Sequence, residues 1–213
     1  MERVEKVLRY YTLCNSLKDV IRTGWKDWKV SRKRLESVAE HIFGVQMLAV
    51  VMKSEYQYEI DILKVIMMLA VHELEEIYIG DLTLFQISKE EKELLGHEAV
   101  EKVLHGLLDK DRIKSLIIEF DKRETPEAKF AYYCDKLECD LQCKLYDEES
   151  CVDLNKQMGN SACENELVKK LLSANMSWSE MWLTFGQERY NYDEYFKEVS
   201  DYAKTHSLKN LVK

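Results

Sequence analysis

Apolar positions recur every three to four residues along most of the chain, a pattern typical of amphipathic and buried helices. Ser-x-x-Glu capping boxes, which satisfy the first free N–H groups of a helix, begin at Ser37, Ser88 and Ser177. Thr125 precedes Pro126, and proline is well tolerated at the first position of a helix. The pattern predicts helices over residues 3–20, 38–56, 60–77, 88–108, 111–122, 126–146 and 193–205, with an aromatic-rich segment after Ser177.

Helix-breaking residues are rare, since the 213 residues include one proline and seven glycines. β-Sandwiches and barrels need turn residues every 8–12 positions, so this composition favours an all-α protein. With 46% apolar residues the chain can bury a sizeable core. We expect a helical bundle over residues 1–150. Residues 151–213 should form an aromatic-rich helical extension that packs on the bundle or on a subunit interface.

The N-terminal segment is charged and amphipathic, without the apolar stretch of a signal peptide. No apolar run reaches the ~18 residues of a membrane span, and the six scattered cysteines are typical of reduced thiols. The net charge of −8 argues against a protein that coats nucleic acid. We therefore expect a cytoplasmic protein whose partners include neither a membrane nor a nucleic-acid polymer.

Positive charge is concentrated in residues 22–34, where six basic residues accompany one acid. Such a segment inside an acidic chain is a candidate site for a small anion. A solvated basic loop would have the same composition, so charge alone does not decide between the two interpretations.

Histidines and acids fall inside the most apolar helices. His41 and His72 lie in the two most apolar predicted helices, Glu73 and Glu76 follow His72, and Asp135 lies on a third largely apolar helix. Buried charges need partners or a metal ion. Two imidazoles and two carboxylates from facing helices would suit a divalent ion such as Mn, Fe, Co or Zn. A histidine on an apolar face can equally be a hydrogen-bonded core residue.

Four segments together resemble a known family: "LKDVIRTGW", "RLESVAEHIFGVQMLA", "LAVHELEEIYIGDLT" and "EAKFAYYCDKLECDLQ". In this order they resemble the HD-domain metal-dependent phosphohydrolases, and among them the YfbR-like branch of 5′-deoxynucleotidases. The resemblance covers roughly residues 8–147. It implies an HD-domain helical bundle that forms a homodimer and hydrolyses nucleoside 5′-monophosphates. It also implies one bound divalent metal ion, which could be Mn, Co, Fe, Zn or Mg.

The resemblance assigns the metal ligands to His41, His72, Glu73 and Asp135. One departure stands among them, because the family has aspartate where this chain has Glu73. Glutamate is longer by about 1.5 Å, whereas metal–ligand distances tolerate only about 0.2 Å. The residue difference raises the alternative of a nucleotide-binding protein that has lost catalysis.

The resemblance also assigns catalytic and substrate-binding residues. Glu76 takes the place of the catalytic glutamate and Asp81 of its supporting aspartate, while Arg22 and Trp25 fall where the family contacts phosphate and sugar. The alternative for Trp25 is a hydrophobic anchor of the basic loop. Glu75 carries no assigned role, and we expect it to face solvent.

The basic loop before His41 is longer than is usual in the family, which leaves the substrate open. A triphosphate or a guanosine polyphosphate is therefore an alternative to a monophosphate. A purely structural helical protein would have no reason to combine four such segments.

Overall fold

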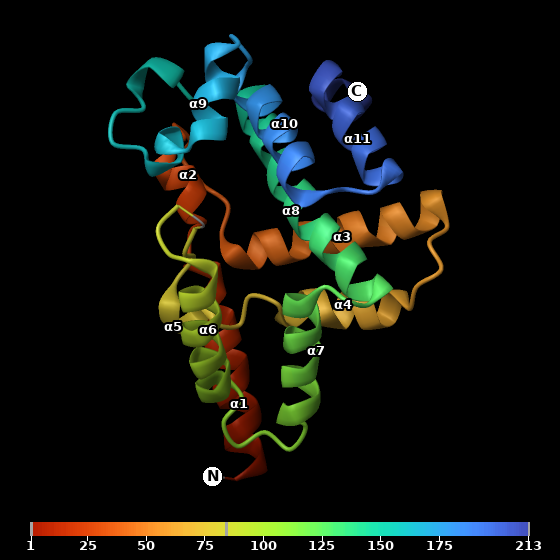
Figure 1. The fold of residues 1–213 in the computed structure, drawn as a ribbon. Coiled ribbons are helices and arrows are strands. Elements are labelled where there is room, and N and C mark those ends of the chain that lie inside the picture. The colour runs from red at the N-terminus through yellow and green to blue at the C-terminus, as the bar shows by residue number, and fades with distance from the viewer. Residues whose placement is uncertain (1, 84, 213) are drawn as a thin grey trace. The chain divides into compact units, whose positions relative to one another are not determined.

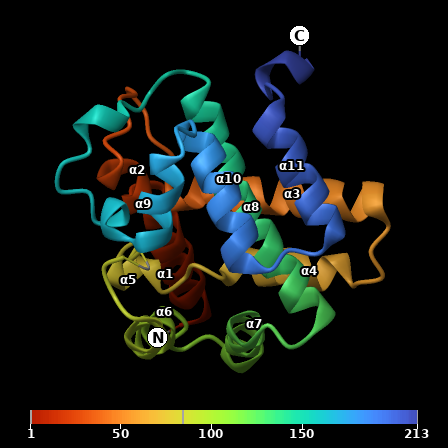
Figure 2. The same cartoon turned by 45° about the horizontal axis from the view of Figure 1, so that its top comes forward.

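The computed structural model describes residues 2–83 and 85–212 (Figures 1 and 2). Over these residues the chain forms α-helices, short 3₁₀ helices and one isolated β-bridge, and no strand is present there. This confirms the all-α prediction. The α-helices are α1 (Arg3–Asn15), α2 (Thr23–Asp27), α3 (Val38–Tyr56), α4 (Ile62–Val71), α5 (Glu76–Ile79), α6 (Lys89–Val103), α7 (Lys110–Lys122), α8 (Pro126–Asp147), α9 (Glu166–Ser173), α10 (Trp178–Tyr190) and α11 (Glu194–Thr205).

The chain forms two compact units. The first comprises the residues up to Thr23 together with Glu36–Tyr132, and the second comprises Gly24–Leu35 together with the residues from Tyr133 onward. Helix α8 begins in the first unit and continues without a break into the second. The boundary expected at residue 150, between a helical bundle and a C-terminal helical extension, stays a prediction.

In the first unit, α3 and α4 lie side by side and run in opposite directions (Figures 1 and 2). Both capping boxes predicted in this unit are present, at Ser37 and Ser88. An apolar cluster formed by α4, the turn after it, α6 and α7 includes Val71, Leu74, Val100, Val103, Leu104 and Ile117. Burial of apolar surface stabilises a fold by about 25 cal/mol per Å², so this cluster contributes to the stability of the unit.

The predicted helix over residues 60–77 is wrong in its length, because α4 ends at Val71. Asp61 caps its N-terminus by accepting hydrogen bonds from the backbone N–H groups of Leu63 and Lys64. His72 is the C-terminal cap residue, and turns follow up to Glu75 before the short helix α5 begins. The apolar pattern continues across this break, because Val71 at the end of the helix and Leu74 in the turns are both buried.

In the second unit, tryptophans from the basic segment pack against the C-terminal helices. The Trp25 ring makes edge contacts with Tyr146 and Trp178, with centroids 5.3 and 6.1 Å apart, and Trp28 packs on Trp178 and Trp182. The capping box at Ser177 is also present. Trp178, Phe185 and Phe196 are buried in this unit, so aromatic residues after position 176 contribute to its core together with the tryptophans of the basic segment.

All six cysteines are free thiols, which agrees with the expectation from their scattered positions. Each helix within the described part of the chain is too short or too polar to cross a lipid bilayer.

Candidate metal centre and active site

Two histidines from different helices approach each other inside the first unit. His41 lies in the first turn of α3, whose start is set by the capping box of Ser37 and Glu40, and its side chain is fully buried. His72 caps the C-terminus of α4 and is also buried. Their ring centroids are 5.8 Å apart. The antiparallel packing of α3 and α4 thus brings the two imidazoles together.

A backbone carbonyl fixes the orientation of the His72 ring. Nδ1 of His72 lies 2.8 Å from the carbonyl oxygen of Leu69. A carbonyl can only accept, so Nδ1 carries the proton, and in the neutral ring Nε2 then holds a lone pair. Histidines that bind metals are commonly oriented in this way, through a hydrogen bond from the other ring nitrogen.

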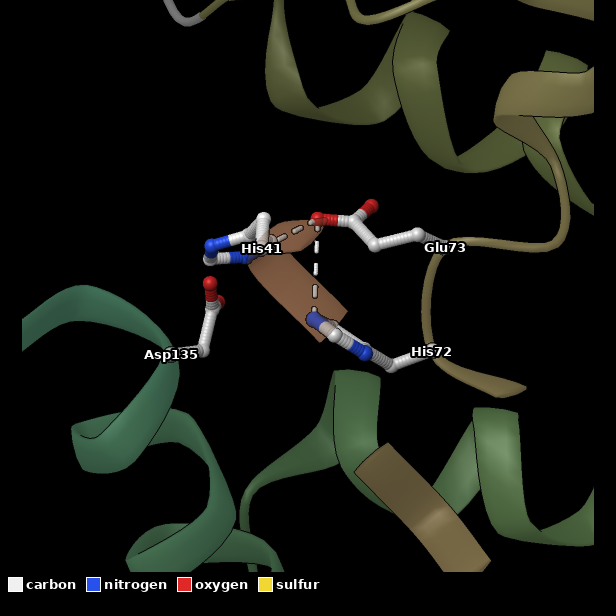
Figure 3. A group of neighbouring side chains, drawn as sticks. All are labelled: His41, His72, Glu73 and Asp135. Carbon is white, nitrogen blue, oxygen red and sulfur yellow. Dashed lines mark ion pairs between the residues drawn. The ribbon is translucent and has the colours of Figure 1, made fainter. Parts of the chain in front are cut away.

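One carboxylate oxygen of Glu73 lies close to both imidazole rings. Its Oε1 atom is 3.5 Å from His72 Nε2 and 3.8 Å from His41 Nε2 (Figure 3). One donor atom from each of the three residues lies within 4.8 Å of the others. Two ligands at about 2.1 Å from a tetrahedral ion are about 3.4 Å apart. The spacing, the burial and the mixed nitrogen–oxygen donors therefore fit a divalent metal ion, and the longer glutamate keeps its carboxylate in the cluster.

Asp135 is buried on α8, three residues beyond Tyr132, the last residue of the first unit. Figure 3 draws its side chain together with the three residues above. Its Oδ2 atom lies 2.7 Å from Nζ of Lys136. Because α8 is continuous, Asp135 is less than one helical turn from residues of the first unit.

Arg22 is placed by backbone pairing with the chain just before α3. Its N–H donates to the carbonyl of Glu36, and the N–H of Val38 donates to the carbonyl of Val20. The guanidinium Nη1 atom lies 3.5 Å from a carboxylate oxygen of both Glu73 and Asp81. The same pairing therefore positions this cation and the helix that carries His41.

Asp81 follows Gly80, whose φ of 73° suits glycine better than other residues. Its Oδ2 atom accepts a hydrogen bond of 2.6 Å from the backbone N–H of Thr23. Together with Arg22, this bond holds the Asp81 carboxylate at a fixed position beside the segment that carries Arg22.

Glu76 is the first residue of α5, and its side chain is fully buried. Burial, followed by the nearby charges of Glu73 and Asp81, raises the pKa of Glu76 well above its usual value. A buried carboxyl group beside a candidate metal cluster is suited to proton exchange.

Lys92 of α6 also reaches this region, a contact that no pattern in the sequence predicts. Its Nζ lies 3.4 Å from Glu76 Oε1 and 3.1 Å from the carbonyl oxygen of Leu82. The capping box at Ser88 placed Lys92 in the first turn of a helix, but no pattern showed which element that turn would contact.

Glu75 does not face solvent as expected. Its Oε2 atom is buried and accepts no hydrogen bond from the described residues. Burial, followed by the charge of Glu73, raises the pKa of Glu75 to about 8. The expectation failed because the break after Val71 turns this side chain toward α6, where it packs against Gly96.

Trp25 is only 3% exposed, and its ring packs on Tyr146 and Trp178 in the second unit. This packing favours the role of a hydrophobic anchor for the basic segment. Lys29 and Arg32 also serve the packing of that unit, since Lys29 donates to two backbone carbonyls and Arg32 pairs with Glu149.

A family model and several known proteins are similar to this chain over most of its length. A family model described as HD domain matches residues 14–174. The protein named 5′-deoxynucleotidase HDDC2 of Dictyostelium discoideum is 33% identical over 151 residues, which are 67% of this chain and 78% of that protein. The human protein of the same name is 31% identical over 146 residues, which are 67% of this chain and 69% of that protein.

Solved structures share the fold. A protein from Pyrococcus horikoshii has a TM-score of 0.64 at 24% identity, and the match covers 95% of this chain and 98% of that one. A protein from Magnetospirillum magnetotacticum, described as a predicted metal-dependent phosphohydrolase, has a TM-score of 0.62 at 19% identity, covering 97% of this chain and 93% of that one. At these identities the likeness is one of fold.

Proposed function

Because this chain belongs to the HD-domain family, we propose that it is a metal-dependent phosphohydrolase acting on ribo- or deoxyribonucleoside 5′-monophosphates. The observation that carries the proposal is the buried cluster of His41, His72 and Glu73, with the Glu76 carboxyl group nearby. The names of the relatives, 5′-deoxynucleotidases at about 30% identity, favour this substrate class.

His41, His72 and Glu73 would hold one divalent ion, and we assign Asp135 as the fourth ligand. Support for Asp135 comes from its burial and from its place on a helix that starts in the same unit as the other three. The donor set suits Mn, Co, Fe or Zn, and Mg remains a candidate. A divalent ion bound there would act as a Lewis acid that activates water and offsets charge on the phosphoryl oxygens.

Glu76 would be the general acid–base residue. Its buried carboxyl group can take a proton from water or return one to the leaving oxygen of the nucleoside. Asp81 would keep the adjoining segment in place, since it is bonded to the backbone N–H of Thr23. These roles separate binding of the ion from proton transfer.

Arg22 would bind the phosphate group, because a guanidinium can donate two parallel hydrogen bonds to phosphate oxygens. In the present structure it pairs with Glu73 and Asp81, and these contacts would orient it for the incoming anion. Trp25 stays a prediction as a sugar contact; its buried ring would act chiefly by holding the segment that follows Arg22.

A catalytically inactive nucleotide-binding protein is the alternative raised by Glu73. The arrangement of Glu73 speaks for activity, because its carboxylate lies within 4 Å of both histidines and of Arg22. An inactive site would have no need to keep a charged residue at each of positions 22, 76 and 81.

The substrate test is phosphate release from a panel of nucleoside mono- and triphosphates and guanosine polyphosphates, with Mn²⁺, Co²⁺ or Mg²⁺ supplied. We expect monophosphates to be hydrolysed and a chelator to abolish turnover. Release from triphosphates alone would contradict the substrate class, and no release from any nucleotide would contradict the enzyme.

The metal test is the variant His72→Ala, analysed for metal content after purification. Loss of the ion together with a loss of turnover is the expected result. His105→Ala is the control, because His105 is exposed and lies outside the cluster. Equal metal content in both variants would contradict the assigned site.

We also propose that the chain forms a homodimer through α3. Phe43, Met47, Val50 and Val51 follow one another at helical spacing and are 47–64% exposed. No charged residue occurs between Ile42 and Met52, so the face suits a second copy of itself better than a charged partner.

Val50→Lys should shift the mass in solution from dimer to monomer, whereas Glu55→Lys should not. A wild-type monomer would contradict the proposal.

A further inference from the structure

Lys92 lies in the first turn of α6, and its side chain reaches the segment Glu76–Leu82, which comprises α5, Gly80, Asp81 and Leu82. Its Nζ atom lies 3.4 Å from Glu76 Oε1 and 3.1 Å from the carbonyl oxygen of Leu82. Glu76 begins this segment and Leu82 follows Asp81 directly. A single ammonium group thus contacts both ends of the seven-residue stretch that carries Glu76 and Asp81.

The face of α6 that meets α5 is shaped for this contact. Gly96 lies four residues after Lys92 and therefore on the same side of the helix. A Cβ atom at Gly96 would lie 3.4 Å from Cγ of Glu75, so the glycine permits a close approach of the two helices. With Gly96 against Glu75 and Lys92 against Glu76, this face of α6 contacts consecutive acids of the site.

The two oxygens of the Glu76 carboxylate have different surroundings. Oε1 has Lys92 as a charged neighbour, whereas Oε2 is buried and accepts no hydrogen bond from the described residues. A buried carboxylate with no charged neighbour would be strongly disfavoured. A cation on one oxygen can fix the side chain and leave the other oxygen able to exchange a proton.

We propose that Lys92 is a positioning residue for the hydrolysis of the phosphate ester. It holds Oε1 of Glu76 and the Leu82 carbonyl at a fixed separation, so that Glu76 Oε2 stays in place relative to Asp81. The inference rests on the proposed function, since it gives Lys92 a part in that reaction. Lys92 would act through Glu76 and would not itself bind the metal ion.

The test compares Lys92→Met, which keeps the aliphatic stem, with Lys92→Arg, which keeps the charge. We expect Lys92→Met to lower kcat by about 10- to 100-fold, the range of a positioned acid–base contribution that is partly lost, with KM and metal content unchanged. Lys92→Arg should recover most of the lost kcat. Lys102→Met, an exposed lysine on the same helix, should leave kcat and KM unchanged.

The dependence on Glu76 is tested in a double variant. Once Glu76→Gln has removed the proton-exchanging group, adding Lys92→Met should produce no further loss of kcat. Equal effects of Lys92→Met and Lys102→Met would overturn the proposal. So would independent, multiplicative losses in the double variant, or a loss in Lys92→Met that Arg does not recover.

Failure of the proposed function can be distinguished from failure of this inference. If the wild type releases no phosphate from any nucleotide, thermal unfolding decides whether Lys92 fixes Glu76. The proteins compared are the wild type, Lys92→Met, Glu76→Gln and the double variant. A Tm loss in the double variant smaller than the sum of the single losses supports the coupling. Additive Tm losses would show that Lys92 and Glu76 act independently, and the inference would then be wrong.

Discussion

The guanidinium of Arg22 and the carboxylate of Glu73 form an ion pair of 3.5 Å in which both side chains are more than four-fifths buried. The same Glu73 oxygen lies within 4 Å of both histidines. The extra methylene of glutamate therefore does not remove the carboxylate from the cluster. It lets one oxygen lie close to Arg22 as well as to the two rings.

Glu73→Asp should weaken metal binding by about tenfold and lower phosphate release. The carboxylate would withdraw by about 1.5 Å, while metal–ligand distances tolerate only about 0.2 Å. Calorimetric titration with Mn²⁺ or Zn²⁺ measures the change, with Glu98→Asp on the exposed face of α6 as control. An inactive wild type whose aspartate variant gains activity would instead indicate a site that has lost catalysis.

Glu76→Gln should lower kcat by about 10²- to 10⁴-fold, because an amide of the same shape cannot exchange a proton. Metal content should stay at the wild-type level, since Glu76 is not one of the proposed ligands. Steady-state kinetics and elemental analysis of the same sample check both points. Loss of the ion in this variant would show that Glu76 binds it, contrary to the assignment.

Asp140→Asn should change how stability depends on pH. Burial raises the pKa of Asp140 well above its usual value of 3.8, with Tyr192 as a hydrogen-bond donor at 3.4 Å. Above pH ~4 the unfolded chain releases this proton while the folded chain keeps it, so rising pH destabilises the fold by up to about 1.4 kcal/mol per unit until the folded group titrates.

The Asn variant lacks this contribution, so its free energy of unfolding should rise relative to the wild type as pH increases above about 4. Denaturant unfolding at several pH values measures the difference. A constant difference between the two proteins over this range would mean that Asp140 titrates alike in both states.

Gly186→Ala should destabilise the second unit by about 1–3 kcal/mol. A Cβ atom at Gly186 would overlap with Oδ2 of Asp140, which is itself buried and cannot move into solvent. Denaturant unfolding measures the loss. Gly24→Ala is the matched control, since nothing lies within 4 Å of the added atom. Similar stability of the two variants would show that Asp140 can shift.

Local sequence signals predicted the helices where a cap and a periodic face agree. Ser37 and Pro126 set the starts of α3 and α8, and the helix over 111–122 was placed within one residue. The long helix over 60–77 was wrong, because a buried apolar run has the same composition in a helix and in the turns that end it.

Contacts between distant segments could not be derived from periodicity. Lys92 lies 16 residues from Glu76, and its role depends on how closely α6 approaches α5 at Gly96. Glu75 was assigned to solvent because its neighbours had roles, yet its orientation depends on the chain path after Val71. Family resemblance supplied the residues of the site; only tertiary packing shows which of them touch.

After the break at Val71, the segment that carries the ligands no longer has the i, i+4 spacing of an α-helix. Backbone N–H groups of Leu74, Glu76 and Tyr78 bond to carbonyls three residues earlier, and in such tight turns side chains three residues apart eclipse one another. Glu73 therefore aligns with Glu76. Inserting or deleting a single residue between them would rotate one acid by about a third of a circle, so this short interval is expected to tolerate no change in length.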